Sequence, residues 1–358
     1  MSGLIKAAVL GFTLIAAVLS FVLADKYAMH IQSAINYARP ERPKLATIIF
    51  GGDMLFDRSI RAAIDQKGED FVFSCIDSIL KDADLVVANL EGPITESASI
   101  SASSAPGDEN NFTFTFPPST AALLQAHNIR MVNLGNNHIL NFGNVGAKLT
   151  ARFLKDASIG YFGQPEIISA EALAQVGTAA CPFEASCEGW AKAGGELMRA
   201  VSTSIVHGVS LAFINYNEFA PAEHTNILEN VGMSSTTIFQ IQNARASGYL
   251  PIVYTHWGVE YATTSSANSR ELAHSFVDAG AEIVIGSHPH VVQEREEYKG
   301  KRIYYSLGNF IFDQYFSEDV RNGLLLSVTF DQNGVASVKE IPVRLESDRR
   351  TCPVLTST

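Results

Sequence analysis

The sequence predicts an α/β fold, and three observations support this prediction. The chain has 358 residues, of which 47% are hydrophobic, so it is long enough to bury one large core or two closely joined ones. Between about residues 45 and 290, apolar runs of strand length alternate with stretches of helical character, as in sheets whose strands are joined by helices. Beyond about residue 300 the apolar runs follow one another with only turns between them, which predicts antiparallel pairing.

The first 24 residues read as an export segment. Lys6 is followed by an unbroken apolar run that extends to Ala24. The run is long for the apolar part of a cleaved signal peptide and near the lower limit for a membrane span. We therefore expect residues 1–24 to be either a signal peptide or a signal anchor. Both alternatives place the rest of the chain outside the cytoplasm, as a membrane-anchored, secreted or periplasmic protein, and residues 25–43 are then a connector that ends in a proline-containing stretch.

The predicted strands are apolar runs bounded by glycine, proline or polar residues. A run that is apolar throughout indicates a strand buried on both faces, as in sheets covered by helices. Such runs lie at residues 45–50, 85–90, 131–134, 161–162, 209–215, 251–256 and 281–285. The antiparallel part is expected at residues 303–307, 323–330 and 336–343, with a hairpin turn at 331–334. Gly51 and Gly52 are expected to turn the chain out of the first strand.

The predicted helices lie between these strands, and polar segments lie outside the core. Helices are expected at residues 71–81, 119–127, 145–157, 235–246 and 269–279. Residues 97–111, rich in Ser, Ala, Gly and Asp, are expected to form a mobile surface loop, and residues 166–200 an insertion away from the core. The folded domain is thus predicted to span residues 44–345, followed by a tail at residues 346–358.

The charge of the chain excludes one class of partner. The formal net charge is −11 and no long run of lysine or arginine occurs, so nucleic-acid binding is not expected. An acidic protein that acts on an anionic substrate needs local positive charge, and bound metal ions can supply it. Arg58 is the best-placed cation near Asp53 for binding such a substrate, and a solvated surface arginine is the alternative.

The cysteines agree with an oxidising compartment. Cys181 and Cys187 are spaced so that a disulfide could join them. Cys75 and Cys352 are expected to be either buried or free. No pair has Cys-x-x-Cys spacing, so neither a structural zinc site nor a redox motif is indicated.

Polar residues of ligand type follow the ends of several predicted strands. In α/β sheets the carboxyl ends of the strands line the ligand crevice, so residues far apart in sequence can meet there. The candidate ligands are Asp53, Glu91, Asn137, His256, His288 and His290. This mixed set of oxygen and nitrogen groups suits zinc, manganese or iron rather than calcium. Six such ligands could hold one or two divalent ions, with one carboxylate bridging a pair.

The two histidines at residues 288 and 290 form the last part of this set. On an extended backbone, residues two apart point to the same side, so both imidazoles could face one ion. The alternative is a loop that merely contains two polar residues.

Six short motifs, taken in order, resemble the CapA family of capsule synthesis and poly-γ-glutamate biosynthesis proteins. The motifs are Gly52-Asp53-Met54-Leu55, Asn89-Leu90-Glu91-Gly92, Gly135-Asn136-Asn137-His138, the segment 255–261, Gly286-Ser287-His288-Pro289-His290 and the segment 306–313. They extend in family order from about residue 46 to residue 343. The fold of this family is related to calcineurin-like metallophosphoesterases, so the resemblance implies a β-sandwich flanked by helices that carries a metal site.

The resemblance also implies roles for individual residues. Asp53 matches the aspartate of the metallophosphoesterase Asp-x-His motif, but Leu55 stands where the histidine would be, so one metal subsite can be weakened or lost. Glu91 takes the place of a bridging aspartate, and His138 that of a catalytic histidine that stabilises or protonates a leaving group. The other implied metal ligands are Asn137, His256, His288 and His290. Glu260 and Asn309 belong to the motifs and would support the ligands indirectly or only pack.

Simpler explanations stay open for these residues. Asp53 could cap a helix, Glu91 and Asn137 could satisfy backbone groups at strand ends, and His138 could be a structural histidine.

Three functions follow from the sequence. The first is an exported protein that acts in the synthesis or export of an anionic capsule polymer of poly-γ-glutamate type, together with membrane-bound capsule synthesis proteins. The second is a metal-dependent hydrolase with a phosphoester as its default substrate. The third is a non-catalytic polymer-binding protein, an alternative that stays open because Leu55 stands where the motif has a histidine.

Overall fold

The computed structural model describes residues 20–29, 44–163, 201–219 and 227–354. The chain divides into two units, Met1–Pro43 and Lys44–Thr358. In the first unit the described residues 20–29 form a helix. Within the described ranges no helix combines the length and the apolar character needed to cross a membrane. Residues 1–19, where most of the expected signal segment lies, and residues 164–200, which include the expected insertion and the Cys181 and Cys187 pair, are outside these ranges.

The second unit is built on two β-sheets. The larger sheet has the strand order β14-β13-β12-β1-β2-β3-β4, with β11 beside β1. Its strands are β1 (Ala46–Met54), β2 (Leu85–Leu90), β3 (Ile129–Asn133), β4 (Gly160–Phe162), β11 (Asn309–Ile311), β12 (Asn322–Asp331), β13 (Gly334–Leu345) and β14 (Thr351–Pro353). The strands β1 to β4 are parallel, whereas β12 pairs antiparallel with β1 and extends the same sheet.

The smaller sheet has the order β5-β6-β7-β8-β10-β9. Its strands are β5 (Val201–Val206), β6 (Val209–Asn217), β7 (Leu250–His256), β8 (Ile283–Ser287), β9 (Arg295–Tyr298) and β10 (Lys301–Tyr304). The four strands β6, β7, β8 and β10 are parallel. The edge strands β5 and β9 each pair antiparallel with their neighbour.

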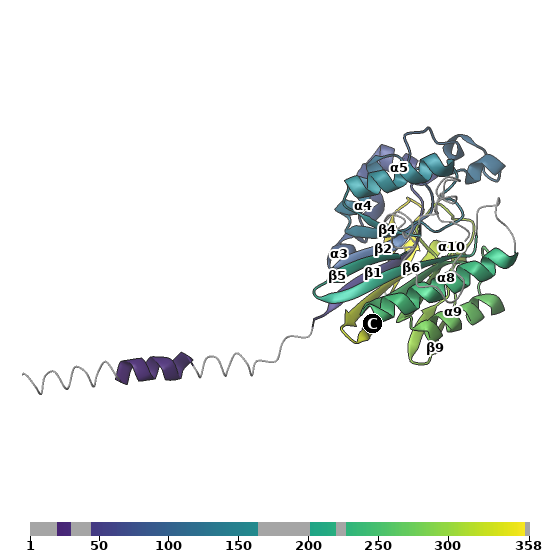
Figure 1. Cartoon of the computed structure of the whole chain (residues 1–358). Helices are drawn as coiled ribbons and strands as arrows, with labels where there is room; N and C mark the ends of the chain where they lie inside the picture. Colours follow the sequence, from purple (N-terminus) through teal and green to yellow (C-terminus); the bar gives the residue numbers. More distant parts are fainter. Residues whose placement is uncertain (1–19, 30–43, 164–200, 220–226, 355–358) are drawn as a thin grey trace, which may run out of the picture. The chain divides into compact units, whose positions relative to one another are not determined.

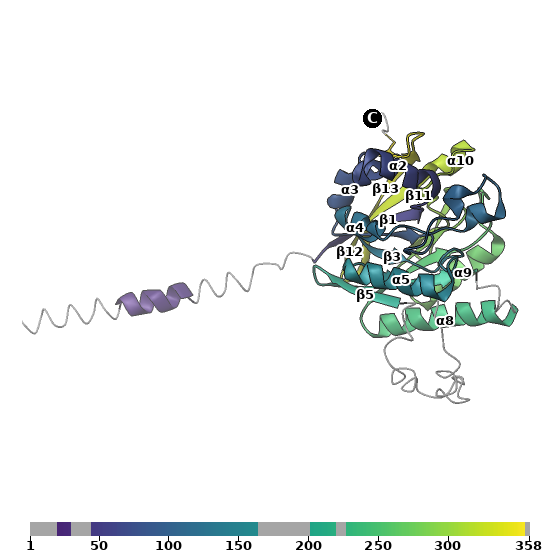
Figure 2. The same cartoon turned by 90° about the horizontal axis from the view of Figure 1, so that it is seen from above.

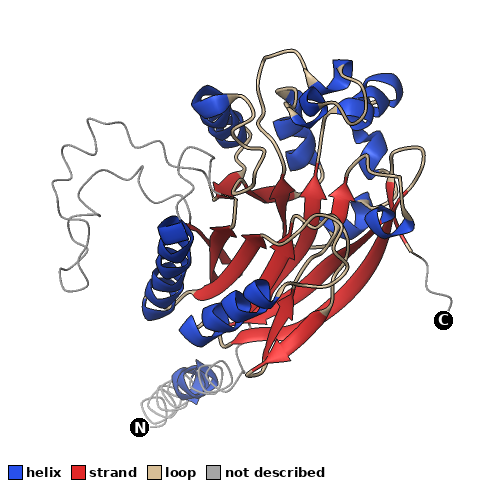
Figure 3. Cartoon of the chain, turned by 90° about the vertical axis from the view of Figure 1, so that its right-hand side faces the viewer, coloured by secondary structure: helices blue, strands red, loops and turns tan. Residues whose placement is uncertain are grey.

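Helices cover the outer faces of the two sheets, which lie against each other (Figures 1 and 3). The described helices are α2 (Arg58–Lys67), η1 (Glu69–Phe73), α3 (Asp77–Lys81), η2 (Ser101–Ser103), η3 (Glu109–Phe112), α4 (Ser119–Ala126), α5 (Gly143–Asp156), α8 (Ile227–Ala246), α9 (Ala267–Ala279) and α10 (Glu318–Arg321). Figure 1 has α4 and α5 above the strands and α8 and α9 below them, and the view from above has α2 and α3 at the edge opposite α8 (Figure 2). The unit is therefore a helix–sheet–sheet–helix sandwich.

Three apolar clusters fill these layers. The central cluster lies between the two sheets and includes Phe50, Phe213 and Phe330. The outer clusters lie under α2 to α5 and under α8 and α9. Along β1 the side chains alternate, because Phe50 joins the central cluster and Ile49 the outer one. Strands that are buried on both faces explain why the sequence shows continuous apolar runs rather than alternation.

The predicted α/β class and the two-sheet arrangement flanked by helices are confirmed, with three corrections to the elements. The chain does not leave β1 at Gly51, because the strand continues to Met54. The predicted antiparallel pairing and the hairpin turn at residues 331–334 are found between β12 and β13, but these strands extend the larger sheet, because β12 also pairs with β1. The strand predicted at residues 303–307 lies at Lys301–Tyr304, where it pairs antiparallel with β9 on one side and parallel with β8 on the other.

Residues 97–111 include two short 3-10 helices, η2 and η3, rather than only loop. The buried side chain of Asp57 anchors this segment, since it accepts hydrogen bonds from the Ser101 hydroxyl at 3.3 Å and the Thr115 backbone N–H at 3.0 Å. The segment is thereby held at the start of α2, beside Arg58.

A disulfide joins Cys75 and Cys352, which are 277 residues apart. The sequence-based expectation that both were buried or free thiols is therefore wrong. Cys75 lies between η1 and α3, and Cys352 lies in β14, a strand within the residues that the sequence analysis assigns to a tail. Nothing in the local sequence relates the two positions, because only the fold brings them together.

Candidate metal centre

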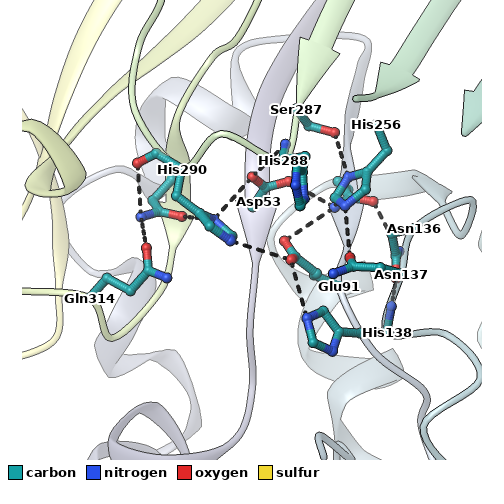
Figure 4. A network of polar contacts seen from close by, with 12 residues as sticks. Asp53, Glu91, Asn136, Asn137, His138, His256, Ser287, His288, His290 and Gln314 are labelled. Atoms are coloured by element: carbon teal, nitrogen blue, oxygen red, sulfur yellow. Dashed lines mark hydrogen bonds and ion pairs between the residues drawn. The ribbon is translucent and has the colours of Figure 1, made fainter. Parts of the chain in front are cut away.

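The candidate ligands converge at the carboxyl ends of strands from both sheets (Figure 4). Asp53 lies near the end of β1, His256 is the last residue of β7, and Glu91 follows β2 directly. Two groups of three side chains have ligand atoms that all lie within 4.8 Å of one another: Glu91 with His256 and His288, and Asp53 with Glu91 and His290. Glu91 belongs to both groups, which is the position of a bridging carboxylate.

Glycine allows the backbone to pack closely at this end of the sheets. A Cβ atom on Gly52 would lie 1.8 Å from the carbonyl oxygen of Gly308, and one on Gly286 would lie 1.9 Å from that of Tyr305. Both contacts are impossible for any other residue. The next residue after Gly52 is Asp53, whose backbone N–H donates to the Gly308 carbonyl at 3.1 Å. The glycines that precede the ligands therefore let the strands that carry them approach.

The sequence predicted that His288 and His290 lie on an extended backbone. The structure instead places them after the end of a strand. β8 ends at Ser287, and the two histidines have φ angles of 96° and 58°. These left-handed conformations are costly for residues with a Cβ, so the surrounding contacts must hold them. One such contact is the His288 backbone N–H, which donates to Asp53 Oδ2 at 3.1 Å. Both imidazoles reach the centre because of this turn, and not because of strand alternation.

Two buried ligand atoms in the centre have no hydrogen-bond partner among the described residues. They are Glu91 Oε1 and His288 Nδ1. Glu91 is fully buried, and its Oε1 lies 3.5 Å from His290 Nε2 and 3.9 Å from His138 Nε2. Buried polar atoms without partners are costly and rare, so each needs an explanation. A bound cation would give both atoms a partner.

The remaining candidates lie around these ligands. The Nε2 atom of His256 lies 2.9 Å from Asn137 Oδ1, and its Nδ1 atom lies 3.0 Å from the Ser287 hydroxyl. Asn309 is buried and its Oδ1 lies 2.9 Å from His290 Nδ1, so this amide orients an imidazole without reaching the centre itself.

Arg58 and Glu260 lie at the edge of the centre. The Arg58 guanidinium forms an ion pair with Asp313 and lies over the Phe114 ring, 4.9 Å from its centroid. The His138 ring packs on the same phenylalanine, with centroids 4.3 Å apart. Glu260 is exposed, and its charge is a minor cause, behind burial and the charge of Asp53, of the raised pKa of Glu91.

A chain of asparagines that was not predicted from the sequence lies behind the candidate ligands. Asn89 donates to Asp53 Oδ1 at 2.8 Å, and its own Oδ1 accepts from Asn133 Nδ2 at 3.0 Å and Asn136 Nδ2 at 3.1 Å. Asn215, from the other sheet, donates to Asn133 Oδ1 at 2.9 Å. Asn89, Asn133 and Asn136 stand at strand ends within or beside the motifs, and that position was the available signal, whereas Asn215 lies inside β6 and in no motif. The chain links both sheets to the Asp53 carboxylate.

The buried charges of the metal-free centre are strongly coupled. Burial raises the pKa of Glu91 well above its ordinary value, and the nearby charge of Asp53 adds to this. Burial also acts to raise the pKa of Asp53, but the hydrogen bond and the charge of His290 outweigh it and lower the pKa. Burial opposes protonation of His290, yet the charge of Glu91 and the bond to Asp53 raise its pKa to about 9. A proton on His290 thus compensates negative charge in the metal-free chain.

Three histidines have the opposite tendency. Burial lowers the pKa of His138 to about 4 and that of His288 to about 3, and it lowers the pKa of His256 as well. The positive charge of a protonated His290 contributes to all three shifts. These imidazoles are therefore neutral near pH 7, which is the form that binds a metal ion.

We expect the metal-free protein to lose stability as the pH falls from about 6.5 to about 4. In this window the unfolded chain protonates His138, His256 and His288, whose ordinary pKa is 6.5, and the folded chain does not. Glu91 opposes the trend because its raised pKa favours the folded state at low pH, but it is one group against three. His290 opposes the trend only at the upper end of this window, because the folded chain already holds this proton and the unfolded chain gains it around pH 6.5.

Thermal unfolding followed by circular dichroism in a chelator, from pH 7 to pH 4, measures this dependence. A His138→Gln variant should show a shallower decline, because it removes one of the three groups. A melting temperature that stays constant or rises on acidification would contradict the expectation.

The fold and the centre together define an α/β sandwich protein with a buried cluster of carboxylates and imidazoles at the carboxyl ends of its strands. Residues 47–314 match the model of a family described as "Bacterial capsule synthesis protein PGA_cap". The match covers most of the chain, so this chain belongs to the bacterial capsule synthesis protein family. The family predicted from the six motifs is confirmed.

Individual relatives agree with this assignment. A "Capsule biosynthesis protein CapA" from Bacillus anthracis is 27% identical over 336 residues, covering 91% of this chain and 73% of that protein. A "PGA biosynthesis protein CapA" from Bacillus subtilis (strain 168) is 27% identical over 319 residues, covering 85% and 75%. The solved structure of TT1561 from Thermus thermophilus has a TM-score of 0.39 to this chain at 11% identity, covering 83% of this chain and 98% of that one.

Proposed function

We propose that this protein acts outside the cytoplasm in the synthesis or export of an anionic capsule polymer of poly-γ-glutamate type, and that it does so through a centre of one or two divalent transition-metal ions. Family membership and the names of the relatives support the capsule role. The main support for a metal centre comes from Glu91. This fully buried carboxylate belongs to both ligand groups, and one of its oxygens lacks a hydrogen-bond partner among the described residues.

The residues fit two ions of unequal affinity. Glu91, His256 and His288 form one group, and Asn137 can complete it with a fourth ligand, because its Oδ1 lies beside His256 Nε2. The other group has three ligands, which are Asp53, Glu91 and His290. Leu55, where the resemblance would place a histidine, is fully buried in the apolar cluster under α2 and offers no ligand. We therefore expect one tight and one weaker site for manganese, zinc or iron.

Two side chains are suited to act on a bound substrate. Metal ions in such a centre lower the pKa of a bound water and stabilise charge on attacking and leaving oxygens. His138 presents Nε2 toward Glu91 and can take or give a proton at that atom. Arg58 adds a guanidinium that can bind a carboxylate or phosphate of the substrate. Asp313 already pairs with Arg58, so an anionic substrate would have to compete with it.

The proposed location rests on two features. The first is the apolar N-terminal segment, as a signal peptide or anchor. The second is the disulfide between Cys75 and Cys352, since disulfides persist mainly in oxidising compartments. The partners required by this role are the anionic polymer and membrane-bound capsule synthesis proteins.

Metal content and turnover test the proposal together. The full-length protein, loaded with zinc or manganese and then dialysed, should retain between one and two ions per chain by mass spectrometry. His288→Ala and His290→Ala should each lower this number, and each should abolish turnover of a phosphoester or of poly-γ-glutamate fragments. Arg58→Gln should keep the metal and bind the polymer fragments more weakly, whereas Lys299→Gln, a remote exposed cation, should change neither.

The outcomes separate the alternatives. Failure to bind any ion at micromolar concentrations would refute the metal centre. Bound metal with turnover of phosphoesters only would favour a general metal-dependent hydrolase. Bound metal and bound polymer without turnover of either substrate would favour the non-catalytic polymer-binding protein.

A further inference from the structure

We infer that Asn141 is a positioning residue that fixes the tautomer of His138, so that the nitrogen facing the metal centre carries a lone pair rather than a hydrogen. The inference concerns a residue in none of the six motifs. It deepens the proposed function, on which its catalytic consequence rests, whereas the tautomer itself follows from the hydrogen bonds of the His138 ring.

The orientation of the Asn141 amide is fixed by the backbone. The side-chain Oδ1 atom of Asn141 lies 2.8 Å from the backbone N of Phe114 and accepts its hydrogen bond. A backbone N–H can only donate, so the amide atom beside it must be the carbonyl oxygen and not the NH₂ group. The usual ambiguity between the two ends of an asparagine amide is thereby removed.

The same oxygen determines which nitrogen of His138 carries hydrogen. Asn141 Oδ1 lies 3.1 Å from His138 Nδ1. An amide oxygen cannot donate, so the hydrogen between the two atoms belongs to Nδ1. A neutral imidazole carries one N–H, which leaves a lone pair on Nε2. That atom is the one directed toward Glu91 Oε1, at 3.9 Å (Figure 4).

Further contacts keep the ring from turning over. One face of the His138 ring packs on Phe114, the residue whose N–H orients Asn141. The His138 backbone N–H donates to Asn136 Oδ1 at 3.1 Å, and its carbonyl accepts from the Asn141 backbone N–H at 3.0 Å. Phe114, Asn141 and His138 thus form one connected unit, which holds both the amide and the imidazole.

The arrangement gives His138 a defined direction of proton transfer. A proton taken from water or from a substrate hydroxyl forms a bond to the Nε2 lone pair and produces an imidazolium with N–H on both nitrogens. The Nδ1–H bond to Asn141 persists during this step and stabilises the cation. The proton is later returned from Nε2 to a leaving oxygen. In the opposite tautomer Nε2–H would face the centre, and the neutral ring could not accept a proton there.

Nuclear magnetic resonance can read the tautomer directly. Long-range ¹H–¹⁵N correlations of the full-length protein with ¹⁵N-labelled histidine distinguish Nδ1–H from Nε2–H rings, and His138→Gln identifies the His138 signals. The measurement is made near pH 7 without metal and again with zinc. We expect His138 to be the Nδ1–H form in the wild type and in Asn141→Asp, whose carboxylate can accept both hydrogen bonds. We expect Asn141→Leu to shift the ring toward Nε2–H, and Asn110→Leu, an exposed control, to leave it unchanged.

These results separate the inference from the proposed function. An Nε2–H ring in the wild type, or an unchanged Nδ1–H ring in Asn141→Leu, would overturn the inference even if the protein binds metal and turns over substrate. If Asn141→Leu does not fold, the wild-type tautomer and Asn141→Asp still decide the question. Where turnover is measurable, Asn141→Leu should lower kcat by about 10- to 100-fold with little change in KM, and Asn141→Asp should restore much of it.

Discussion

Replacing Glu91 with glutamine is expected to abolish binding of both metal ions and, at the same time, to stabilise the metal-free protein. The two effects have one cause. In the metal-free chain burial and the charge of Asp53 raise the pKa of Glu91, so its ionised form is disfavoured in the folded state. A raised carboxyl pKa means that stability is lost as the pH rises above the ordinary value of 4.5. The neutral glutamine of nearly the same shape removes this cost, which is roughly 1–3 kcal/mol for a buried polar group without a partner.

With metal present the order of stability should reverse. A ligand that binds only the folded state, at 100 to 1,000 times its Kd, stabilises the wild type by about 3–4 kcal/mol. Glu91→Gln should gain almost nothing at the same metal concentration, because Glu91 belongs to both ligand groups. Removing a ligand that served only one ion, such as Asp53, should leave part of the gain.

Thermal unfolding at pH 8 with chelator and with zinc measures both parts of this prediction. Glu297→Gln is the matched control, because it removes the same charge from an exposed position in β9. This control should retain the full stabilisation by metal. A Glu91→Gln variant that is less stable than wild type in chelator, yet still stabilised by zinc, would show that Glu91 is a structural carboxylate and not a bridging ligand.

The sequence was sufficient to predict which side chains gather at this edge of the sheets, because one rule of α/β sheets connects sequence position to space. Each candidate ligand follows an apolar run, and parallel strands bring such ends to one edge. Asp53, Glu91 and His256 therefore meet although they come from different sheets. What the rule does not give is the local backbone. The left-handed φ angles of His288 and His290 depend on contacts with other strands, so strand alternation does not explain why both imidazoles face the candidate centre.

The supporting residues were harder to predict because their roles come from pairing across the fold. Asn89 meets Asp53 only because the register of β1 and β2 places them side by side. Asn141 accepts from the backbone N–H of Phe114, which lies 27 residues earlier in the chain. Asparagine is common in turns, so its presence at a strand end is weak evidence for a network. The antiparallel pairing of β12 with β1, which joins two ends of the domain, is likewise a long-range contact without a local signature.

Loss of the disulfide between Cys75 and Cys352 is expected to destabilise the folded unit by about 2–5 kcal/mol. The bond closes a loop of 277 residues, so it restricts the unfolded chain over most of the domain. In the folded state it fastens β14, which otherwise pairs with β13 over only three residues, to the turn between η1 and α3. The melting temperature of a Cys75→Ala and Cys352→Ala double variant should therefore fall by about 4–10 °C, since a domain of this size loses roughly 2 °C per kcal/mol.

Reductant distinguishes the disulfide from a simple loss of packing. Both cysteines are only partly buried, so a thiol reagent can reach the bond in the wild type and should lower its melting temperature to that of the double variant. The double variant should not respond to reductant, unless Cys181 and Cys187 form the disulfide that their spacing allows. Hydrogen exchange should be fastest in β14 after reduction, because that strand loses its covalent link to the rest of the fold. The parallel strands that carry the candidate ligands keep their hydrogen-bonded neighbours in the sheet. Metal binding should therefore survive reduction at temperatures below the transition, and its loss there would mean that the C-terminal strand supports the centre as well as the fold.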